Sequence, residues 1–408
     1  MSQQEAVICI GAGLLQTYML REIQTLGFLA IATDADPAAP GFAVADDFYI
    51  ADTYDLDATR HVVTELAHHY TIRGVVTCGA DVAPTVSAAA EALGLPHLPL
   101  EIARLTHDKA KVRQRLHEAG LDQYQPRWTF VHKDEGLYGW HQAAGYVGYP
   151  LVVKPRSQRA SRGVTLVQGM EALAPAIRKA LSYGQTAILE ERLIGSEHSM
   201  EMLLDASGAV VFFNLGDRVF SYAGGLAMEC GHMNPTCLVP AHQHQMLMML
   251  QATARALGVT WGPFKMDALL TTEGHPMLLE CTARLSGGFD AQRTCPLTGR
   301  HPMRTLLQLA CDLPVTPQLD ITQAQGYAAC AAILPAQQGR ITTLPGAPDG
   351  VEVIWAVKAG ETIAPAQHNG ERAGYVLATG EDYQTTWARA RTLAEYLATA
   401  MVIEGDNT

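Results

Sequence analysis

Residues 261–288, WGPFKMDALLTTEGHPMLLECTARLSGG, contain two short apolar runs separated by the turn sequence TTEGHP. This pattern predicts a β-hairpin, and the two strands of a hairpin pair antiparallel. The first strand carries Lys265 and Asp267, and the second ends on Glu280. We expect the two carboxylates to lie near each other on one face, where they repel unless a cation lies between them.

A divalent metal ion is the cation that best explains Glu280, because a buried, uncompensated carboxylate is very costly. Oxygen ligands with room for water and phosphate suit Mg²⁺ better than Zn²⁺. Arg284 and the small residues Ser286, Gly287 and Gly288 follow the strand. Backbone at such residues approaches a ligand closely and offers N–H donors to a carboxylate. The hairpin therefore predicts a magnesium site beside a ligand-binding loop.

Composition limits the classes of function. The chain has 408 residues, 48% of them hydrophobic, so we expect two to four well-packed domains. Its formal net charge of -12 argues against a broad nucleic-acid or anionic-membrane surface, so any anion site is local. No signal-peptide pattern occurs, and no apolar run approaches the roughly 18 residues of a membrane span. We expect a soluble, cytoplasmic protein with no nucleic-acid or membrane partner.

The 8 cysteines are scattered without a CxxC pair, which is typical of reduced cysteines in a cytosolic protein. Cys230, His232 and Cys237 have a spacing that fits no common zinc pattern. We expect these cysteines to be structural.

The first 100 residues alternate apolar strands with amphipathic helices, which indicates a parallel α/β sheet with helices on its faces. The predicted strands lie in AVICIGAG, LAIATDAD and GVVTCGAD, and the predicted helices span residues 14–26, LDATRHVVTELAHHY and about 84–93.

The glycine turn after the first strand has three interpretations. Gly11 and Gly13 precede a helix, and Asp34 closes the next strand, as in a dinucleotide-binding fingerprint. Gln16 occupies the position of the third glycine of that fingerprint. The turn binds a nicotinamide or flavin, faces a small substrate, or only shapes the exit of the strand.

Residues 101–125 are predicted to be helical, with Thr106 as N-cap and Lys109 in the first turn. Predicted strands at 151–154 and 164–167 flank a loop rich in small and cationic residues. Such a loop suits a polyanion such as triphosphate, although a solvated basic loop would have the same composition. The loop contains Ser157, Ser161, Gly163 and the arginines at 156, 159 and 162.

The segment TAILEERLIGSEHSMEMLLD predicts a strand, a tight connector at Gly195 and a second strand. Its four glutamates, Glu190, Glu191, Glu197 and Glu201, alternate with apolar neighbours. They either bind a ligand or face solvent on an edge strand.

The order of these segments resembles the ATP-grasp superfamily of carboxylate-amine ligases, which includes biotin carboxylase and the L-amino acid ligases. The resemblance is carried by Lys109, LVVKP with Lys154, the basic loop, ILEERLIGSE, FKMDALL and LLECTARLSGG. Residues 326–398 resemble the small C-terminal domain of the biotin carboxylase branch. The resemblance implies an ATP-grasp fold with an N-terminal α/β domain (1–105), a small lobe (106–205), a large lobe (206–322) and a C-terminal subdomain (323–408).

The resemblance also implies that the chain binds ATP. Lys109 and Lys154 would contact the nucleotide phosphates, and the basic loop would close over them. Glu190 would lie beside the adenine amino group, the backbone of Glu191 to Leu193 would bond the ring edge, and Glu197 would bond the ribose hydroxyls.

The implied metal is Mg²⁺, with Mn²⁺ as a possible substitute, held by Asp267 and Glu280. Thr282 stands where family members commonly have Asn, so it would be a weaker third ligand. Lys265 and Arg284 would neutralise charge as a carboxylate attacks the γ-phosphate of ATP. An amine would then attack the acyl phosphate.

The segment DRVFSYAGGLAMECGHMNPT resembles the part of L-amino acid ligases that lines the substrate pocket, and it contains Arg218, Glu229 and His232. Glu229 would hold an α-amino group and His232 would orient or deprotonate it, or both are structural. We expect a small carboxylate and an amine as substrates, one of them an amino acid, and the chain permits a homodimer.

Three other functions remain open at this point. An enzyme of the same fold could only phosphorylate its substrate or activate bicarbonate. A nicotinamide-dependent oxidoreductase would leave the acidic hairpin and the basic loop unexplained. A non-catalytic protein that keeps the fold is the third, and Thr282 is the feature that suggests it.

Overall fold

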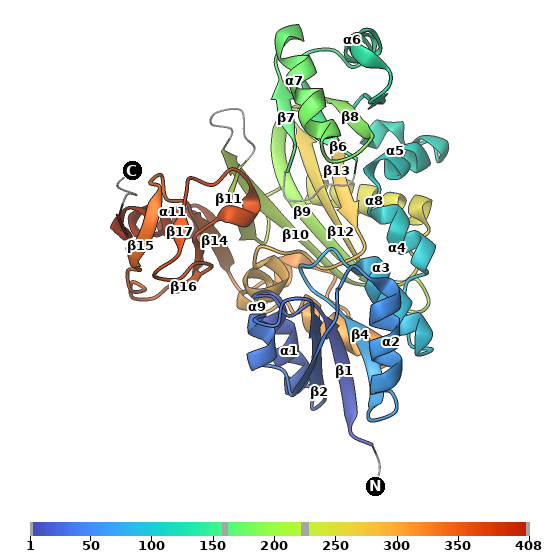
Figure 1. Ribbon diagram of the computed structural model, residues 1–408, viewed down its shortest axis with the longest axis vertical. Helices are drawn as coiled ribbons and strands as arrows, with labels where there is room; N and C mark the ends of the chain where they lie inside the picture. The colour runs from blue at the N-terminus through green and yellow to red at the C-terminus, as the bar shows by residue number, and fades with distance from the viewer. Residues whose placement is uncertain (1–2, 157–161, 222–227, 405–408) are drawn as a thin grey trace.

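The computed structural model describes residues 3–156, 162–221 and 228–404. Figure 1 shows an N-terminal domain at the bottom, a small lobe at the top and a C-terminal segment at the left, joined by a long central sheet. No helix within the described residues has the length and hydropathy needed to cross a membrane.

The N-terminal domain is built on a parallel sheet in the order β3-β2-β1-β4. The strands β1 and β2 are apolar and buried on both faces, as is typical of parallel sheets. This confirms the predicted α/β order, although the four-residue strand β3 was not predicted. The elements are β1 (Glu5–Ile10), α1 (Gln16–Thr25), β2 (Leu29–Asp34), η1 (Pro40–Ala43), β3 (Asp47–Ile50), α2 (Leu56–Leu66), β4 (Thr71–Val76) and α3 (Ala83–Ala92).

Two helices, α4 (Leu100–Thr106) and α5 (Lys109–Glu118), lead into the small lobe. The predicted N-cap at Thr106 is wrong, because Thr106 ends α4. Asp108 caps α5 instead, since its carboxylate accepts hydrogen bonds of 3.2 Å from the backbone N–H groups of Ala110 and Lys111. Lys109 is therefore the first residue of its helix.

The small lobe is an antiparallel sheet in the order β5-β8-β6-β7, covered by two helices. Both strands predicted around the basic loop are confirmed as β6 and β7. The elements are η2 (Asp122–Tyr124), β5 (Trp128–His132), α6 (Gly136–Val147), β6 (Leu151–Pro155), β7 (Thr165–Val167), α7 (Met170–Leu181) and β8 (Thr186–Glu191).

The central sheet has eight strands in the order β13-β12-β9-β10-β11-β14-β18-β16. Asp267 and Glu280 are paired residues of β12 and β13, as predicted for the hairpin. A methionine-rich core, with Met200 and Met246, joins the sheet to α8. The elements up to the C-terminal segment are β9 (Gly195–Leu204), β10 (Val210–Ser221), β11 (Met228–Asn234), α8 (Pro240–Leu257), β12 (Gly262–Thr271), β13 (Pro276–Thr282), η4 (Asp290–Thr294), α9 (Cys295–Leu297), α10 (Pro302–Ala310) and η5 (Ile321–Gln323).

The C-terminal segment does not form an isolated sheet, because three of its strands extend the central sheet beyond β11. The helix α11 packs on β14 and β18, and a second, three-stranded sheet has the order β17-β15-β19. The division at residue 323 stays a prediction. The elements are β14 (Tyr327–Ile333), β15 (Gly339–Thr343), β16 (Glu352–Trp355), β17 (Thr362–Ile363), η6 (Asn369–Glu371), β18 (Gly374–Gly380), α11 (Tyr383–Ala400) and β19 (Val402–Glu404).

Candidate functional site

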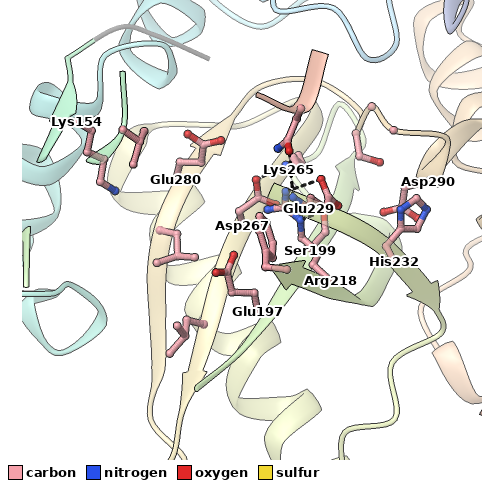
Figure 2. A pocket seen from close by; sticks show the side chains of 18 of the residues that line it. Lys154, Glu197, Ser199, Arg218, Glu229, His232, Lys265, Asp267, Glu280 and Asp290 are labelled. Carbon is pink, nitrogen blue, oxygen red and sulfur yellow. Dashed lines mark hydrogen bonds and ion pairs between the residues drawn. The ribbon is translucent and has the colours of Figure 1, made fainter. Parts of the chain in front are cut away.

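A cavity of about 510 Å³ lies where the small lobe, the central sheet, the N-terminal domain and the C-terminal segment meet. Figure 2 shows charged side chains from several strands facing one another in it. It brings together most of the residues singled out from the sequence: Lys109, Lys154, Glu190, Glu191, Leu193, Glu197, Arg218, Glu229, His232, Lys265, Asp267, Glu280, Arg284, Ser286, Gly287 and Gly288.

Glu190 is the acidic centre of the small-lobe side of the cavity. Its side chain is 4% exposed, lies 3.0 Å from Arg113 Nη2 and forms an ion pair with Lys154. Burial opposes its charge, but Arg113 and Lys154 outweigh burial and lower the pKa of Glu190. The solvent-facing alternative is therefore wrong for Glu190. Burial lowers the pKa of Lys154, although Glu190 opposes this shift.

Glu280 lies in a different setting from the one the sequence suggested. Its side chain is 46% exposed toward the cavity rather than buried in the interior, and Lys109 Nζ lies 3.3 Å from its Oε2. Desolvation opposes its charge, but Lys109, Lys265 and Lys154 outweigh that effect and hold the pKa of Glu280 at about 2. Glu280 is therefore ionised at neutral pH and faces the cavity as an oxygen donor.

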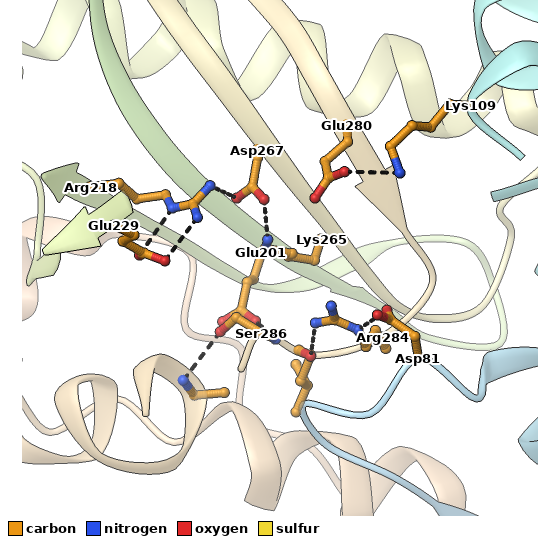
Figure 3. A network of polar contacts seen from close by, with 12 residues as sticks. Asp81, Lys109, Glu201, Arg218, Glu229, Lys265, Asp267, Glu280, Arg284 and Ser286 are labelled. Carbon is orange, nitrogen blue, oxygen red and sulfur yellow. Dashed lines mark hydrogen bonds and ion pairs between the residues drawn. The ribbon is translucent and has the colours of Figure 1, made fainter. Parts of the chain in front are cut away.

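Asp267, opposite Glu280, is also held by protein cations. Lys265 Nζ lies 2.5 Å from Asp267 Oδ2, and Arg218 Nη1 lies 3.0 Å from Oδ1 (Figure 3). The two carboxylates are thus tolerated by lysine and arginine side chains, so a metal is not required to explain them.

The donor set nevertheless fits a magnesium ion that is shared with a ligand. Asp267 and Glu280 line the same cavity, and Mg²⁺ commonly takes one or two carboxylates together with substrate phosphates and water. Within the described residues, no group of three or more His, Cys, Asp or Glu side chains is arranged to hold a metal by itself. Thr282 does not line the cavity, and its buried Oγ1 has no hydrogen-bond partner among the described residues. Metal binding stays a prediction.

The wall formed by β10, β11 and the C-terminal segment is centred on Glu229. Arg218 donates to both of its oxygens at 3.2 and 3.0 Å, and Arg372 Nη2 donates at 2.9 Å. Burial opposes the charge of Glu229, but the two arginines outweigh burial and hold its pKa far below the ordinary value. Glu229 is a permanent anion whose charge is already matched.

His232 is buried at the far end of the cavity (Figure 2), where its Nε2 lies 3.2 Å from Thr294 Oγ1. Burial lowers its pKa, although the nearby Asp290 opposes this shift. His232 is therefore neutral at pH 7, as a group that accepts a proton must be.

The loop after β13 is fixed by two acidic residues. Arg284 Nε donates to Asp81 Oδ1 at 2.5 Å, and Arg284 Nη1 donates to the carbonyl oxygen of Leu285 at 2.9 Å. The backbone N–H of Ser286 donates to Glu201 (Figure 3). Burial, reinforced by Asp290, raises the pKa of Glu201 to about 7. The solvent-facing alternative is wrong for Glu201 as well, because this side chain is buried.

Two glycines bring the N-terminal domain against this loop. Gly79 has φ +67°, and a Cβ there would lie 2.6 Å from Leu15 Cδ1 and 3.3 Å from Gly287 Cα. A side chain at Gly79 would be strained at this positive φ, would displace the Leu15 side chain and would crowd the backbone of Gly287. The backbone of Gly287 can therefore line the cavity.

Several predicted positions do not line the cavity. Gly163 has φ +75°, and a Cβ there would lie 2.7 Å from Pro155 Cγ and from Tyr183 Cε2, so it is needed for backbone shape. Ser157 and Ser161 lie outside the described residues. In the N-terminal turn, Asp34 Oδ2 accepts a 2.7 Å hydrogen bond from Ala12 N, which favours the interpretation that this turn shapes the strand exit.

The sequence reasoning missed Asp81, Arg113, Asp290 and Arg372. Arg113 follows Lys109 by four residues on one helix face, so helical spacing could have found it. Asp81 lies just after the carboxyl end of β4, where ligand-binding residues of parallel sheets gather. Asp290 and Arg372 reach the cavity from segments whose sequence shows no such signal.

Three family models match separate parts of the chain in the expected order. The ATP-grasp N-terminal domain matches residues 25–97, the ATP-grasp domain matches residues 147–292, and the L-amino acid ligase C-terminal domain 2 matches residues 332–401. The formate-dependent phosphoribosylglycinamide formyltransferase of Salmonella schwarzengrund (strain CVM19633) is 31% identical over 181 residues, which cover 44% of each protein. The match thus spans less than half the length of that relative.

Solved structures agree with these matches. The L-amino acid ligase from Bacillus licheniformis superposes over 100% of both chains with a TM-score of 0.79 and 22% identity. The biotin carboxylase domain of Hydrogenobacter thermophilus 2-oxoglutarate carboxylase, solved as a dimer with MgADP, ADP and bicarbonate, gives a TM-score of 0.74 at 16% identity, covering 99% of this chain and 91% of that one. The sequence resemblance and the expected fold are confirmed: the chain belongs to the ATP-grasp superfamily.

Proposed function

We propose that the protein is an ATP- and magnesium-dependent ligase that activates a carboxylate as an acyl phosphate and joins it to an amine, with an amino acid as one substrate. The observation that carries the proposal is the cavity, which places lysines, a facing carboxylate pair and an arginine-bound glutamate around one space. The match of residues 332–401 to an L-amino acid ligase domain supports an amino acid as substrate.

The lysines form the phosphate side of the proposed site. Lys109 is paired with Glu280 and Lys154 with Glu190, which offsets the charge of the two lysines. A nucleotide phosphate would exchange these pairs for charge-assisted bonds of the same kind. Asp267 and Glu280 would hold Mg²⁺, which when bound neutralises phosphate charge and aligns the phosphates for in-line attack.

The proposed chemistry proceeds in two steps. A substrate carboxylate oxygen attacks the γ-phosphorus of ATP, the bond to the bridging oxygen breaks, and ADP leaves. The amine then attacks the carbonyl carbon of the acyl phosphate, phosphate leaves, and the amine loses a proton. Lys265 and Arg284, which line the cavity, would stabilise the negative charge of both transition states.

The end of the cavity near Glu229 is the proposed amino acid side. Glu229 is matched by Arg218 and Arg372, so an incoming α-amino group would compete with two guanidinium groups for it. The arginines, by contrast, can shift part of their hydrogen bonding to a substrate carboxylate. Neutral His232 and the carboxylate of Asp290 complete this end of the cavity.

A substrate screen tests the proposal. Amino acids and small carboxylates are paired with amines in the presence of ATP and Mg²⁺, and ADP release and product mass are measured. Ligation requires one ADP and one amide product for each amine consumed. ADP formation that never depends on an amine would contradict the proposal.

A second candidate is the activation of a one-carbon acid. The relative that is 31% identical over 181 residues is named as formate-dependent, and one structural neighbour contains bicarbonate. Formate and bicarbonate therefore belong in the screen. Release of ADP with either acid, without an amino acid, would favour this candidate.

A further inference from the structure

A second cavity, of about 290 Å³, lies away from the proposed active site, between the N-terminal domain and the large lobe. It is bordered by α1, by the turn η4 and by α10, and α1 and α10 are in contact. Three guanidinium groups line it, those of Arg21, Arg293 and Arg304, against one carboxylate, Glu22. The cavity is thus net positive in a chain whose formal net charge is -12.

The arginines of this cavity, which we call the arginine cavity, are held in place but not saturated. Arg304 Nε lies 2.6 Å from Glu22 Oε1, and Arg293 is paired with Glu352 of β16. Arg293 Nε is buried and has no hydrogen-bond partner among the described residues. Such a donor is costly unless a ligand or water meets it.

Neutral donors complete the lining. Burial and the neighbouring Arg304 lower the pKa of His301, so His301 is neutral at pH 7 and offers an N–H group. Tyr18 adds a hydroxyl group, whereas the hydroxyl of Thr25 already donates to the carbonyl oxygen of Arg21 at 2.9 Å. Planar guanidinium groups with added N–H and O–H donors match the tetrahedral oxygens of a phosphoryl group.

The arginine cavity is connected to the proposed active site through η4. Gln292 lines the arginine cavity, and its Nε2 donates to the carbonyl oxygen of Ser286 at 2.9 Å. Asp290, two residues earlier in the same turn, lines the larger cavity. A ligand that moves or stiffens η4 therefore acts on the loop from Ser286 to Gly288.

We propose that the arginine cavity binds a phosphoryl oxyanion, either inorganic phosphate or the phosphate group of a small phosphomonoester, and that this binding stabilises the loop from Ser286 to Gly288. The proposal does not depend on the reaction proposed above. It goes beyond that reaction, because it places a second ligand outside the cavity where ATP and substrates would bind.

Calorimetric titration of the full chain with inorganic phosphate, at constant ionic strength, tests the binding. Arg21 is exposed at the rim of the cavity, so Arg21→Gln removes a cation without disturbing the core. Arg391→Gln removes the same charge from an exposed position on α11 and serves as the matched control. We expect the Kd of one phosphate site to rise at least about tenfold in Arg21→Gln and to stay unchanged in Arg391→Gln.

A double variant, Glu22→Gln with Arg304→Gln, removes both partners of an ion pair at once. We expect this variant to lose phosphate binding at the arginine cavity as well. Glycerol 3-phosphate is titrated in parallel, and tighter binding than that of inorganic phosphate identifies a phosphomonoester as the ligand. Equal phosphate affinity in the wild type, Arg21→Gln and the double variant would overturn the proposal, since the phosphate would then bind elsewhere.

Hydrogen exchange measures the connection to the loop without any assay of activity. Phosphate should slow backbone exchange in residues 286–294 of the wild type and of Arg391→Gln, and should have no such effect in Arg21→Gln. Unchanged exchange in the wild type at saturating phosphate would overturn the proposed effect on the loop.

Discussion

The pKa values of two glutamates of the site are shifted in opposite directions. Lysines around Glu280 hold its pKa at about 2, whereas burial raises the pKa of Glu201 to about 7. Acidic residues whose pKa values are shifted in opposite directions are a feature of catalytic sites. Glu280 is suited to bind a cation, and Glu201 is suited to hold the backbone of the loop from Ser286 to Gly288.

Removing the charge of Glu280 should remove activity but not the fold. Its side chain is 46% exposed, so Glu280→Gln leaves no buried group without solvent or partner. Loss of one of the two facing carboxylates should lower kcat/KM for ATP by at least about 100-fold, because it removes a ligand of a metal ion whose stabilisation of transition-state charge is worth several kcal/mol. Steady-state ADP release gives kcat/KM, and circular dichroism checks the fold.

Glu273→Gln, an exposed change in the turn of the same hairpin, is the control and should keep wild-type activity. Full activity in Glu280→Gln would show that the metal assignment is wrong.

Glu201 should make stability depend on pH near neutrality. Because its pKa is raised to about 7, the folded protein keeps a proton that the unfolded chain releases above its ordinary pKa of about 4.3. The contribution of Glu201 to the free energy of unfolding is therefore at its maximum below about pH 4. It falls as the pH rises to about 7, by up to about 1.4 kcal/mol per pH unit.

Glu201→Gln should flatten this dependence, since the amide stays neutral and its oxygen can still accept the N–H of Ser286. Thermal unfolding at several pH values between 5 and 8 measures it. Glu65→Gln, at an exposed position of α2, serves as the control and should keep the wild-type slope. The same slope in Glu201→Gln would show that another group titrates in this range.

At the scale of elements, hydrophobic pattern was enough to place the site strands. Apolar runs and turn residues predicted β6, β7, β8, β9 and the hairpin of β12 and β13, and antiparallel pairing within that hairpin predicted that Asp267 and Glu280 lie on one face. The pattern could not show that β14, β16 and β18 extend the central sheet, because strand order depends on long-range packing rather than on local sequence. Strand β3 was missed because four residues, DFYI, are too few to show a period.

Helix α5 depends on Arg113 to join it to the strands. Arg113 is 2% exposed, and it bonds Glu190 at 3.0 Å and the carbonyl oxygens of Leu278 and Leu279 at 3.0 Å each. Arg113→Gln should lower the free energy of unfolding by about 3–5 kcal/mol, the range seen when one partner of a buried ion pair is removed. Urea unfolding measures it.

Arg115→Gln is the matched control for this prediction, because Arg115 lies on the same helix with a side chain that is 50% exposed. Its ion pair with Glu118 spans one turn of the helix, so the change should be below about 0.5 kcal/mol. Equal effects of the two substitutions would mean that Arg113 does not connect the elements in solution.

At the scale of the whole molecule, the central sheet explains how distant segments share one site. It runs from the hairpin of β12 and β13 to β18 of the C-terminal segment. Arg372, just before β18, reaches Glu229 on β11, more than 140 residues earlier in the sequence. The C-terminal segment therefore contributes to the cavity itself rather than only supporting the large lobe.

Arg372 should separate substrate binding from nucleotide binding. In Arg372→Gln the carboxylate of Glu229 keeps both bonds from Arg218, so its charge stays matched and the fold should persist. Loss of a charged hydrogen-bond donor near the amino acid side should raise the KM for that substrate about tenfold or more. The KM for ATP should stay within about twofold, because Lys154 of the proposed phosphate side lies at the other end of the cavity from Glu229 (Figure 2).

Initial rates with each substrate varied in turn distinguish these effects. Arg372→Lys keeps the charge but not the paired geometry and should recover only part of the affinity. Arg391→Gln, on α11 of the same segment, should change neither KM. If both KM values rise together in Arg372→Gln, the C-terminal segment acts by holding the lobes in place. If only the KM of the substrate at the amino acid side rises, the C-terminal segment helps to determine which substrate binds there. Exchange of this segment between related chains should then transfer the preference for that substrate without altering the KM for ATP.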